Sequence, residues 1–149
     1  MRIVIQRVTR ASVSIEGRVE SAIEKGMMVL LGVGYADTDD DIDWLVKKTI
    51  NLRIFDDSEG VMNLSVKDVE GSILVVSQFT LMASCKKGNR PSYIHAASPD
   101  VSVPLYERFC QRLSESLGKP VSTGVFGADM QVELVNDGPV TIVIDSEDK

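Results

Sequence analysis

The sequence predicts an α+β protein whose sheets are covered by helices. Many short apolar segments are rich in β-branched residues and are separated by turn residues, which is typical of strands. Only two segments have the apolar spacing of an amphipathic helix. The chain has 149 residues, the size of one domain, so we expect a single domain over residues 1–149.

The first part of the chain is predicted to form strands. Residues 2–8 alternate between apolar and polar side chains, and residues 11–15 are a second strand. Residues 16–18 have the composition of a turn, so residues 19–23 are expected to return as the other strand of a hairpin. Residues 27–33 are continuously apolar, which favours a strand that is buried on both faces.

The first predicted helix covers residues 38–52. Thr38 is a suitable N-cap, and the aspartates at 39–41 lie in the first turn, where the helix dipole favours negative charge. The residues on its apolar face are Ile42, Leu45, Val46, Thr49 and Ile50. Two short strands, at residues 53–55 and 61–64, are expected to follow the helix and to pair.

The second helix is predicted to start near Pro104, because proline is well suited to the first position of a helix. Ser102 or Val103 would then be its cap, and Gly118 and Pro120 end it. Its apolar seam repeats every four residues and consists of Leu105, Phe109, Leu113 and Leu117.

The remaining strands complete the sheet. Residues 73–76 are predicted to form a central strand, and residues 84–100 contain the glycine and prolines of a loop. Further strands are expected near residues 121–126, 130–135 and 139–144.

Composition argues against several classes of function. The net charge of −6 counts against a non-specific nucleic-acid or DNA-binding protein, which needs a basic surface, although an RNA substrate can still be held locally. No apolar run approaches the roughly 20 residues of a membrane span, and the N-terminus lacks the features of a signal peptide. We therefore expect a cytoplasmic protein without a membrane partner.

The cysteines and the single histidine predict no metal chemistry. Cys85 and Cys110 form no C-x-x-C pair and are expected to be reduced thiols. His95 has no cysteine or carboxylate partner at metal-ligand spacing, so neither a metal nor a cofactor is expected. The larger aromatic residues are expected in the core and not as stacking platforms for bases. They are Trp44, Phe55, Phe109 and Phe126.

Two polar segments follow apolar runs and are the candidates for a functional site. Residues 77–81, Ser-Gln-Phe-Thr-Leu, follow the predicted strand at 73–76. Residues 136–141, Asn-Asp-Gly-Pro-Val-Thr, follow the apolar run at 130–135. Polar residues at strand ends present a site from a rigid scaffold.

These segments resemble the signatures of the D-aminoacyl-tRNA deacylases. The resemblance continues from Ser77 to Tyr93, SQFTLMASCKKGNRPSY, and includes residues 1–8, MRIVIQRV, and the chain length. It implies a sheet-rich, barrel-like or layered β-β-α fold with two main helices, which works as a homodimer with active sites at the subunit interface. It also implies hydrolysis of the ester between a D-amino acid and the 3′ end of tRNA.

The resemblance places the catalytic residues at Ser77, Gln78, Phe79 and Thr80. Cleavage of an ester by water puts negative charge on the former carbonyl oxygen, and donors aimed at that oxygen stabilise the transition state. A polar turn can present consecutive backbone N–H groups to one point. We therefore expect the N–H groups of Phe79 and Thr80 to form the oxyanion hole.

Two routes to activate water remain open. The hydroxyl of Ser77 or Thr80 is a weak nucleophile without a base, and His95 is the only histidine that could complete a triad. Alternatively, the 2′-hydroxyl of the substrate ribose, which lies next to the ester, positions or activates the water. The second route agrees with the family resemblance.

The resemblance assigns substrate selection to Gly138 and Pro139, with Arg7 nearby. In this family the Gly-Pro bond is cis and reaches into the partner subunit's active site, where its carbonyls receive the substrate's α-amino group. Its bulk occupies the space that an L side chain needs, so L-aminoacyl-tRNA is rejected. Glycine has no side chain, so mischarged Gly-tRNA is a further expected substrate. Arg7 either holds this segment or is a surface charge.

Lys86, Lys87 and Arg90 share one loop that directly follows the catalytic motif. They are either a solvated charge cluster or a clamp on the phosphates of the tRNA acceptor end, which would position the substrate without reading its sequence. Two alternatives remain for the whole chain. One is a non-catalytic tRNA- or RNA-binding module, and the other is a small-ester hydrolase with a Thr/Ser–His arrangement.

Overall fold

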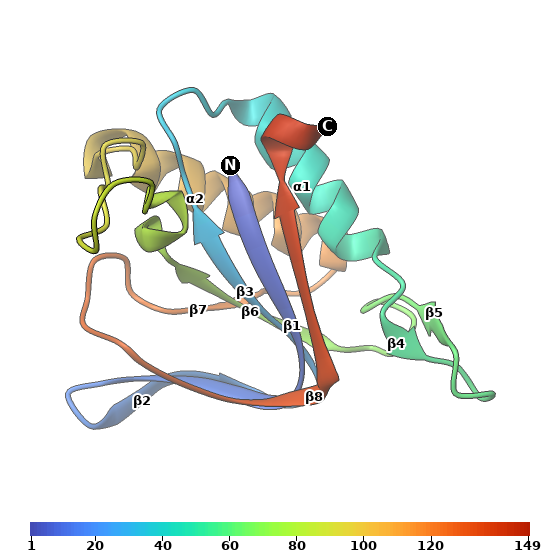
Figure 1. Cartoon of the computed structure of the whole chain (residues 1–149). Helices are drawn as coiled ribbons and strands as arrows, with labels where there is room; N and C mark the ends of the chain where they lie inside the picture. Colours follow the sequence, from blue (N-terminus) through green and yellow to red (C-terminus); the bar gives the residue numbers. More distant parts are fainter.

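The computed structural model describes the whole chain, residues 1–149, and confirms the α+β class. A curved mixed sheet is covered on one side by two helices (Figure 1). The sheet consists of β1 (Arg2–Ile15), β2 (Arg18–Ile23), β3 (Gly26–Gly32), β6 (Ser72–Ser77), β7 (Ser122–Thr123) and β8 (Gln131–Asp145). A separate hairpin consists of β4 (Phe55–Asp56) and β5 (Met62–Leu64). The helical segments are α1 (Asp39–Asn51), α2 (Pro99–Leu117) and the short 3₁₀ turns η1 (Phe79–Met82) and η2 (Ser146–Asp148). None of these helices has the length and apolarity needed to cross a membrane.

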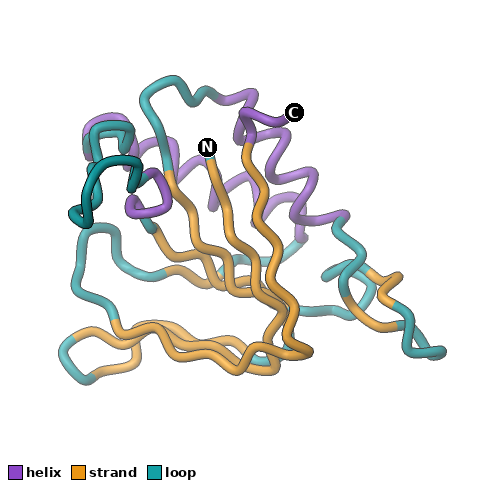
Figure 2. Tube along the Cα trace, viewed as in Figure 1, coloured by secondary structure: helices purple, strands orange, loops and turns teal.

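β1 organises the sheet because it pairs with three strands. Its first half pairs with β3 and its second half with β2, while β8 pairs along nearly its whole length on the other side. These pairs are antiparallel, whereas β6 runs parallel to β3 and β7. The sheet bends strongly and is nearly closed, as the barrel-like prediction implied (Figure 2).

The central strands are buried on both faces, as the apolar run at 27–33 predicted. Val29 and Val75 point into the main core, whereas Met28 and Leu74 point into a smaller core on the opposite face. The main core also takes the apolar faces of both helices, including Leu45 and Phe109. The helices therefore pack against one face of the sheet and keep its strand ends in fixed positions.

The second helix begins earlier than predicted. α2 starts at Pro99 with Ser98 as its N-cap, and the amide of Ser102 donates to the Ser98 carbonyl at 2.8 Å. Pro104 lies inside the helix, where its ring removes the N–H that would bond to the carbonyl of Asp100. The prediction was wrong because both prolines suit a first helical position, and only Pro99 also follows a serine cap.

The N-terminal strands predicted at 2–8 and 11–15 are one continuous strand, β1. The polar residues 9–10, which separated them in the sequence, lie where β1 passes from β3 to β2. The chain keeps its extended conformation across this change of partner because β8 still pairs with β1 there.

The C-terminal strands predicted at 130–135 and 139–144 are likewise one strand, β8. Its residues 137–140 stand opposite Arg7 alone, because Asn136 pairs with Val8 and Thr141 with Gln6. Residues 137–140 therefore bulge out of the ladder. Two other predicted strands are shifted or shorter: the one at 53–55 is Phe55–Asp56, and the one at 121–126 is Ser122–Thr123.

Candidate active site

The first predicted motif lies where the chain passes from β6 into η1. Ser77 ends β6, and the amide of Gln78 donates to the carbonyl of Leu31 at 2.8 Å, which ties the turn to the end of β3. The side-chain amide of Gln78 donates to the hydroxyl of Thr80. Residues 77–80 therefore lie together at one end of the sheet, as the sequence predicted.

The backbone of η1 leaves two amides without an acceptor inside the turn. Leu81 donates to the carbonyl of Gln78 at 3.2 Å, and Ala83 donates to the carbonyl of Thr80 at 3.1 Å. The N–H groups of Phe79 and Thr80 come before the first of these donors in the chain. Neither has an acceptor within η1, as is usual for the first donors of a helical turn. They are consecutive donors at the end of a strand, so both can donate a hydrogen bond to the same acceptor atom.

A cavity of about 320 Å³ opens beside this turn. Residues 76–79 form one wall, and residues 126–130 with Val132 form the other. The second wall was not predicted from the sequence, which placed Phe126 in the core. Phe126 is half-buried against the ring of Tyr106 at a centroid distance of 5.6 Å, so it belongs to both the core and the cavity. The Gly-Ala-Asp composition of residues 127–129 was the available signal for an exposed loop.

Arg2 fixes the far end of η1. Its guanidinium donates to the carbonyl of Leu81 at 2.6 Å and pairs with the carboxylate of Asp145 at 2.6 Å. Gly32 lies against the same turn, where an added Cβ would come within 2.9 Å of Leu81 Cβ and 3.1 Å of the Gln78 carbonyl oxygen. The turn packs this closely on β3 because that position lacks a side chain. The sequence offered no signal for the role of Arg2.

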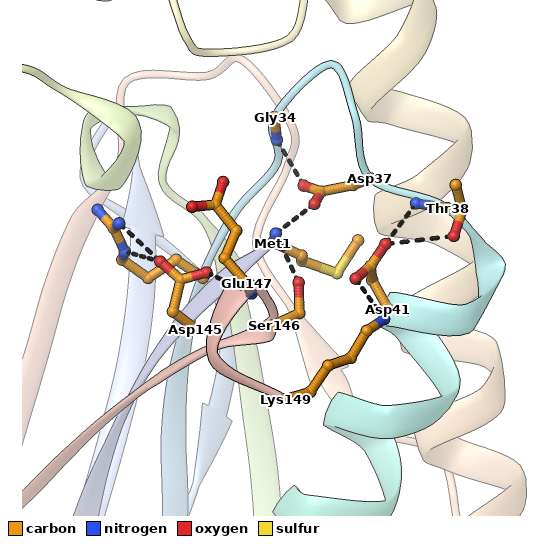
Figure 3. Close-up of polar contacts among 10 residues, drawn as sticks. Met1, Gly34, Asp37, Thr38, Asp41, Asp145, Ser146, Glu147 and Lys149 are labelled. Atoms are coloured by element: carbon orange, nitrogen blue, oxygen red, sulfur yellow. Dashed lines mark hydrogen bonds and ion pairs between the residues drawn. The ribbon is translucent and has the colours of Figure 1, made fainter.

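The N-terminal ammonium group of Met1 is buried next to Arg2 (Figure 3). It forms an ion pair with Asp37 and donates to the hydroxyl of Ser146 at 2.9 Å. The second oxygen of Asp37 accepts the amide of Gly34 at 2.6 Å. The side chain of Met1 belongs to the main core, so Arg2 extends from a fixed starting point.

Asp41 ties the start of α1 to the C-terminus in the same region (Figure 3). Its carboxylate accepts hydrogen bonds from Lys149 Nζ and from the amide of Thr38, both at 2.8 Å. Burial raises the pKa of Asp41, but the hydrogen bonds from Lys149, Thr38 and Ser146 outweigh burial and hold the pKa well below its ordinary value. The ionised form of Asp41 therefore stabilises the fold.

Stability is expected to fall in acid as Asp41 is protonated. A group whose pKa is lower in the folded state stabilises fully above its unfolded value, about 4, and this stabilisation is lost as the pH falls from there toward the folded pKa. In Asp41→Asn the free energy of unfolding should therefore depend less on pH below about 4 than in the wild type. Urea unfolding at several pH values tests this, with Asp40→Asn as an exposed control on the same turn. An unchanged pH dependence in Asp41→Asn would contradict it.

The second predicted motif is held by Arg7. The Gly138–Pro139 peptide bond is cis, and Gly138 has a φ of 126°. Arg7 is only 7% exposed and donates to the carbonyls of Asp137 at 3.0 Å and Ile54 at 2.7 Å. A Cβ on Gly138 would lie 2.9 Å from Arg7 Nη2, so this approach requires glycine. Arg7 therefore contacts this segment and is not a surface charge.

The two motifs do not meet within one chain. Arg2 contacts η1 and Arg7 contacts the segment at 136–141, and the five-residue step between them along β1 spans about 17 Å. Figure 1 likewise places the turn after β6 and the bend of β8 at opposite ends of the sheet. One chain alone therefore does not form a site that contains both motifs.

His95 does not form a triad with the hydroxyls of the first motif. It is exposed, and no hydrogen bond joins it to Ser77 or Thr80. It lines two other cavities together with Met82 and Glu147. The small-ester hydrolase with a Thr/Ser–His arrangement therefore has no geometric support.

The remaining predicted positions are partly exposed. Cys85 and Cys110 are free, as predicted, and burial raises the pKa of Cys110 to about 12. The three basic residues of the predicted phosphate clamp, Lys86, Lys87 and Arg90, are exposed and form no ion pair. Their loop is closed by two hydrogen bonds between the backbones of Ser84 and Ser92, at 2.8 and 2.9 Å. Lys86 lines a cavity that it shares with Arg2 and His95. Phe55 and Phe109 are buried as predicted, whereas Trp44 is only half-buried.

The chain is thus an α+β protein in which a turn with two hydroxyl side chains lies beside a cavity at the end of the sheet, and His95 is not hydrogen-bonded to these hydroxyls. Residues 4–145 match the family described as D-Tyr-tRNA(Tyr) deacylase. The chain belongs to this family.

Relatives and solved structures are similar to this chain over nearly its whole length. A protein of Bacteroides fragilis (strain YCH46) named D-aminoacyl-tRNA deacylase is 66% identical, over 100% of this chain and 99% of the relative. A protein of the same name from Bacteroides thetaiotaomicron is 64% identical over the same shares. A solved structure titled c-Myc DNA Unwinding Element Binding Protein has a TM-score of 0.93 and 42% identity, and covers 97% of this chain and 98% of its own. A second, titled as a probable eukaryotic D-amino acid tRNA deacylase, has a TM-score of 0.82 at 20% identity over 96% of this chain and 97% of its own, and shares the fold.

Proposed function

We propose that this chain hydrolyses the ester bond of D-aminoacyl-tRNA and releases the free D-amino acid and the tRNA. The observation that carries the proposal is the pair of consecutive amides at Phe79 and Thr80, which have no acceptor inside η1; Phe79 lines the cavity together with Ser77 and Gln78, and Thr80 follows it directly in the chain. Donors fixed in this way stabilise the negative oxygen of the transition state without reorganising. The family and the names of its close relatives support the same reaction.

In this reaction water attacks the carbonyl carbon of the ester, and the bond from that carbon to the ribose oxygen breaks. The proton lost by water passes to the leaving ribose oxygen. His95 forms no hydrogen bond to Ser77 or Thr80, which supports the 2′-hydroxyl of the substrate ribose as the group that positions the water. The hydrogen bond from the side-chain amide of Gln78 to the hydroxyl of Thr80 holds the shape of the turn that supplies the oxyanion donors.

A tRNA that ends in 2′-deoxyadenosine is therefore expected to be hydrolysed about 10²-fold more slowly than normal D-Tyr-tRNA, in the range of one lost acid–base contribution. The measurement is the single-turnover rate for both substrates at saturating enzyme. Equal rates would assign the activation of water to the protein instead.

Two copies of the chain are proposed to form a homodimer in which the Gly138–Pro139 segment of one subunit completes the cavity beside η1 of the other. Within one chain the two motifs lie at different ends of β1, and Gly138 and Pro139 are exposed. Exposed apolar side chains are available for such a contact: Phe79, Val132, Val135 and Val143.

The same arrangement accounts for selection of the D enantiomer. The carbonyls of Gly138 and Pro139 receive the α-amino group of the substrate, and the segment fills the space that an L side chain needs. Selectivity then comes from a clash against the wrong enantiomer. Gly-tRNA escapes this clash and is also a substrate.

Arg7→Met is expected to lower kcat/KM for D-Tyr-tRNA about tenfold and the free energy of unfolding by about 2–3 kcal/mol. The variant leaves the buried carbonyl of Ile54 and the partly buried carbonyl of Asp137 without their donor, and an unsatisfied buried group costs about 1–3 kcal/mol. Arg10→Met is the matched control on the same strand, because Arg10 forms only an exposed pair with Glu133, which contributes at most about 1 kcal/mol. Hydrolysis assays and urea unfolding of both variants test this. Equal effects would show that Arg7 does not hold the segment.

Lys86, Lys87 and Arg90 are proposed to contact phosphates of the acceptor end, since they are free cations close to η1.

The experiment that tests the function as a whole compares hydrolysis of D-Tyr-tRNA and L-Tyr-tRNA by the purified protein. Loss of the D ester with survival of the L ester is expected. Equal cleavage would remove Gly138–Pro139 as the gate, and no cleavage would favour a non-catalytic RNA-binding module.

A further inference from the structure

A basic cavity lies at the C-terminal end of α1, away from the turn η1. It has a volume of about 540 Å³ and is lined by Trp44, Lys47, Lys48, Asn51, Leu52 and Arg53. No acidic side chain lines it, and none of its three cationic side chains forms an ion pair. The cavity therefore gathers three cations without an ion-pair partner, and of these Lys47 also borders a second cavity that contains Asp43 and Glu115.

This concentration stands out in a chain with a net charge of −6. Other cations on the helices are compensated: Arg112, for example, pairs with Asp39 and Asp43. Lys48 Nζ lies 5.4 Å from the centroid of the Trp44 ring, a cation–π contact that orients the ammonium group at the cavity. The contact with Trp44 thus holds the ammonium group of Lys48 in place.

The cavity adjoins the elements that hold the second motif. Arg53 is followed directly by Ile54, whose carbonyl accepts the hydrogen bond from Arg7 at 2.7 Å. Arg7 in turn donates to Asp137, next to Gly138. In Figure 1 the end of α1 lies on the same side of the molecule as β4, β5 and the bend of β8.

We propose that this cavity binds the phosphodiester backbone of the tRNA substrate. The inference rests on the proposed function, in which Gly138–Pro139 of one subunit completes the partner's site. The cavity would then lie beside a composite site whose other border is the loop with Lys86, Lys87 and Arg90. Cations from both subunits would hold one tRNA, and this explains how an acidic protein can bind a polyanion locally.

Binding of uncharged tRNA tests the inference without depending on catalysis. The variant K47Q/K48Q/R53Q changes three exposed side chains and is expected to bind fluorescently labelled tRNA about tenfold more weakly at moderate salt. The slope of log Kd against log salt concentration should fall by up to about three, roughly one for each lost phosphate contact.

The matched control removes the same charge elsewhere: R18Q/K25Q/K119Q alters three cations that do not line the cavity. Its Kd is expected to stay within about twofold of the wild type, because it loses only distant, screened charge. Unchanged binding in the cavity variant, or equal weakening in both variants, would overturn the inference.

A substrate without phosphates separates this inference from the proposed function. D-tyrosyl adenosine carries the ester but no backbone, so the cavity variant should hydrolyse it at the wild-type rate. If the wild type hydrolyses neither substrate while the cavity variant alone loses tRNA binding, the proposed function fails and the inference stands. If the cavity variant also loses the adenosine substrate, its defect lies in the catalytic site and the inference fails.

Discussion

Phe79→Pro is expected to lower kcat for D-Tyr-tRNA by about 10²- to 10³-fold, because it removes one of the two N–H groups proposed to hold the oxyanion. Loss of one such donor costs about 2.7–4 kcal/mol of transition-state stabilisation in characterised hydrolases. KM should change much less, since the substrate keeps its contacts to the remaining amide and to the tRNA-binding cations.

The backbone at this position can accept proline. Phe79 is the first residue of η1, where the helical φ matches that of the proline ring and no acceptor inside the turn is lost. Gln78 has φ −144° and ψ 80°, outside the α region that a following proline disfavours. The variant is therefore expected to fold, and a thermal unfolding curve checks this.

Phe79→Ala is the matched control for Phe79→Pro. It keeps the N–H but removes the ring, which is 55% exposed and packs edge-on against Tyr93 at a centroid distance of 5.0 Å. Its single-turnover rate should stay within about tenfold of the wild type, since it keeps the N–H and loses the contact with Tyr93, worth about 0.5–1.5 kcal/mol, and one of the apolar side chains offered to the partner subunit. Equal losses in the two variants would assign the effect to the ring and exclude the amide.

Elements whose signals are local in sequence were predicted well. The first helix was found because a threonine cap and three aspartates precede its apolar face, and α1 indeed has Thr38 as its N-cap. The start of α2 was missed because Pro99 and Pro104 both suit a first helical position, and the serine directly before Pro99 was not weighed as its cap. The continuity of β1 was missed because pairing with β8, far away in the chain, carries the strand past Thr9 and Arg10.

The candidate site could likewise be predicted only where its signal is local in the sequence. Residues 77–80 are consecutive, so their position at the end of one strand could be predicted from the sequence. The contacts that hold the two motifs could not, because Arg2 reaches Leu81 and Arg7 reaches Ile54 and Asp137 across long separations in the chain. A basic residue on a strand gives no indication of which distant carbonyl it will meet, since only the packed sheet decides this.

An extension of two residues before Met1, such as Gly-Ser, is expected to lower the free energy of unfolding by about 3–5 kcal/mol. The extension replaces the ammonium group by an amide, which leaves the buried carboxylate of Asp37 without its charged partner. Removal of one partner from a buried ion pair costs about this much, because the remaining charge stays desolvated. The same two residues added after Lys149, which is exposed, are the control and should cost less than about 1 kcal/mol.

A double-mutant cycle identifies the cause of this loss. If the unpaired carboxylate is responsible, Asp37→Asn should be destabilising in the chain with a free Met1 but nearly neutral in the extended chain. Hydrolysis should fall with the extension even where both proteins are fully folded, because Met1 anchors Arg2 and Arg2 holds the Leu81 carbonyl of η1. Additive effects in the cycle, or full activity in the folded extended chain, would separate the N-terminal ammonium group from the turn that it is expected to support.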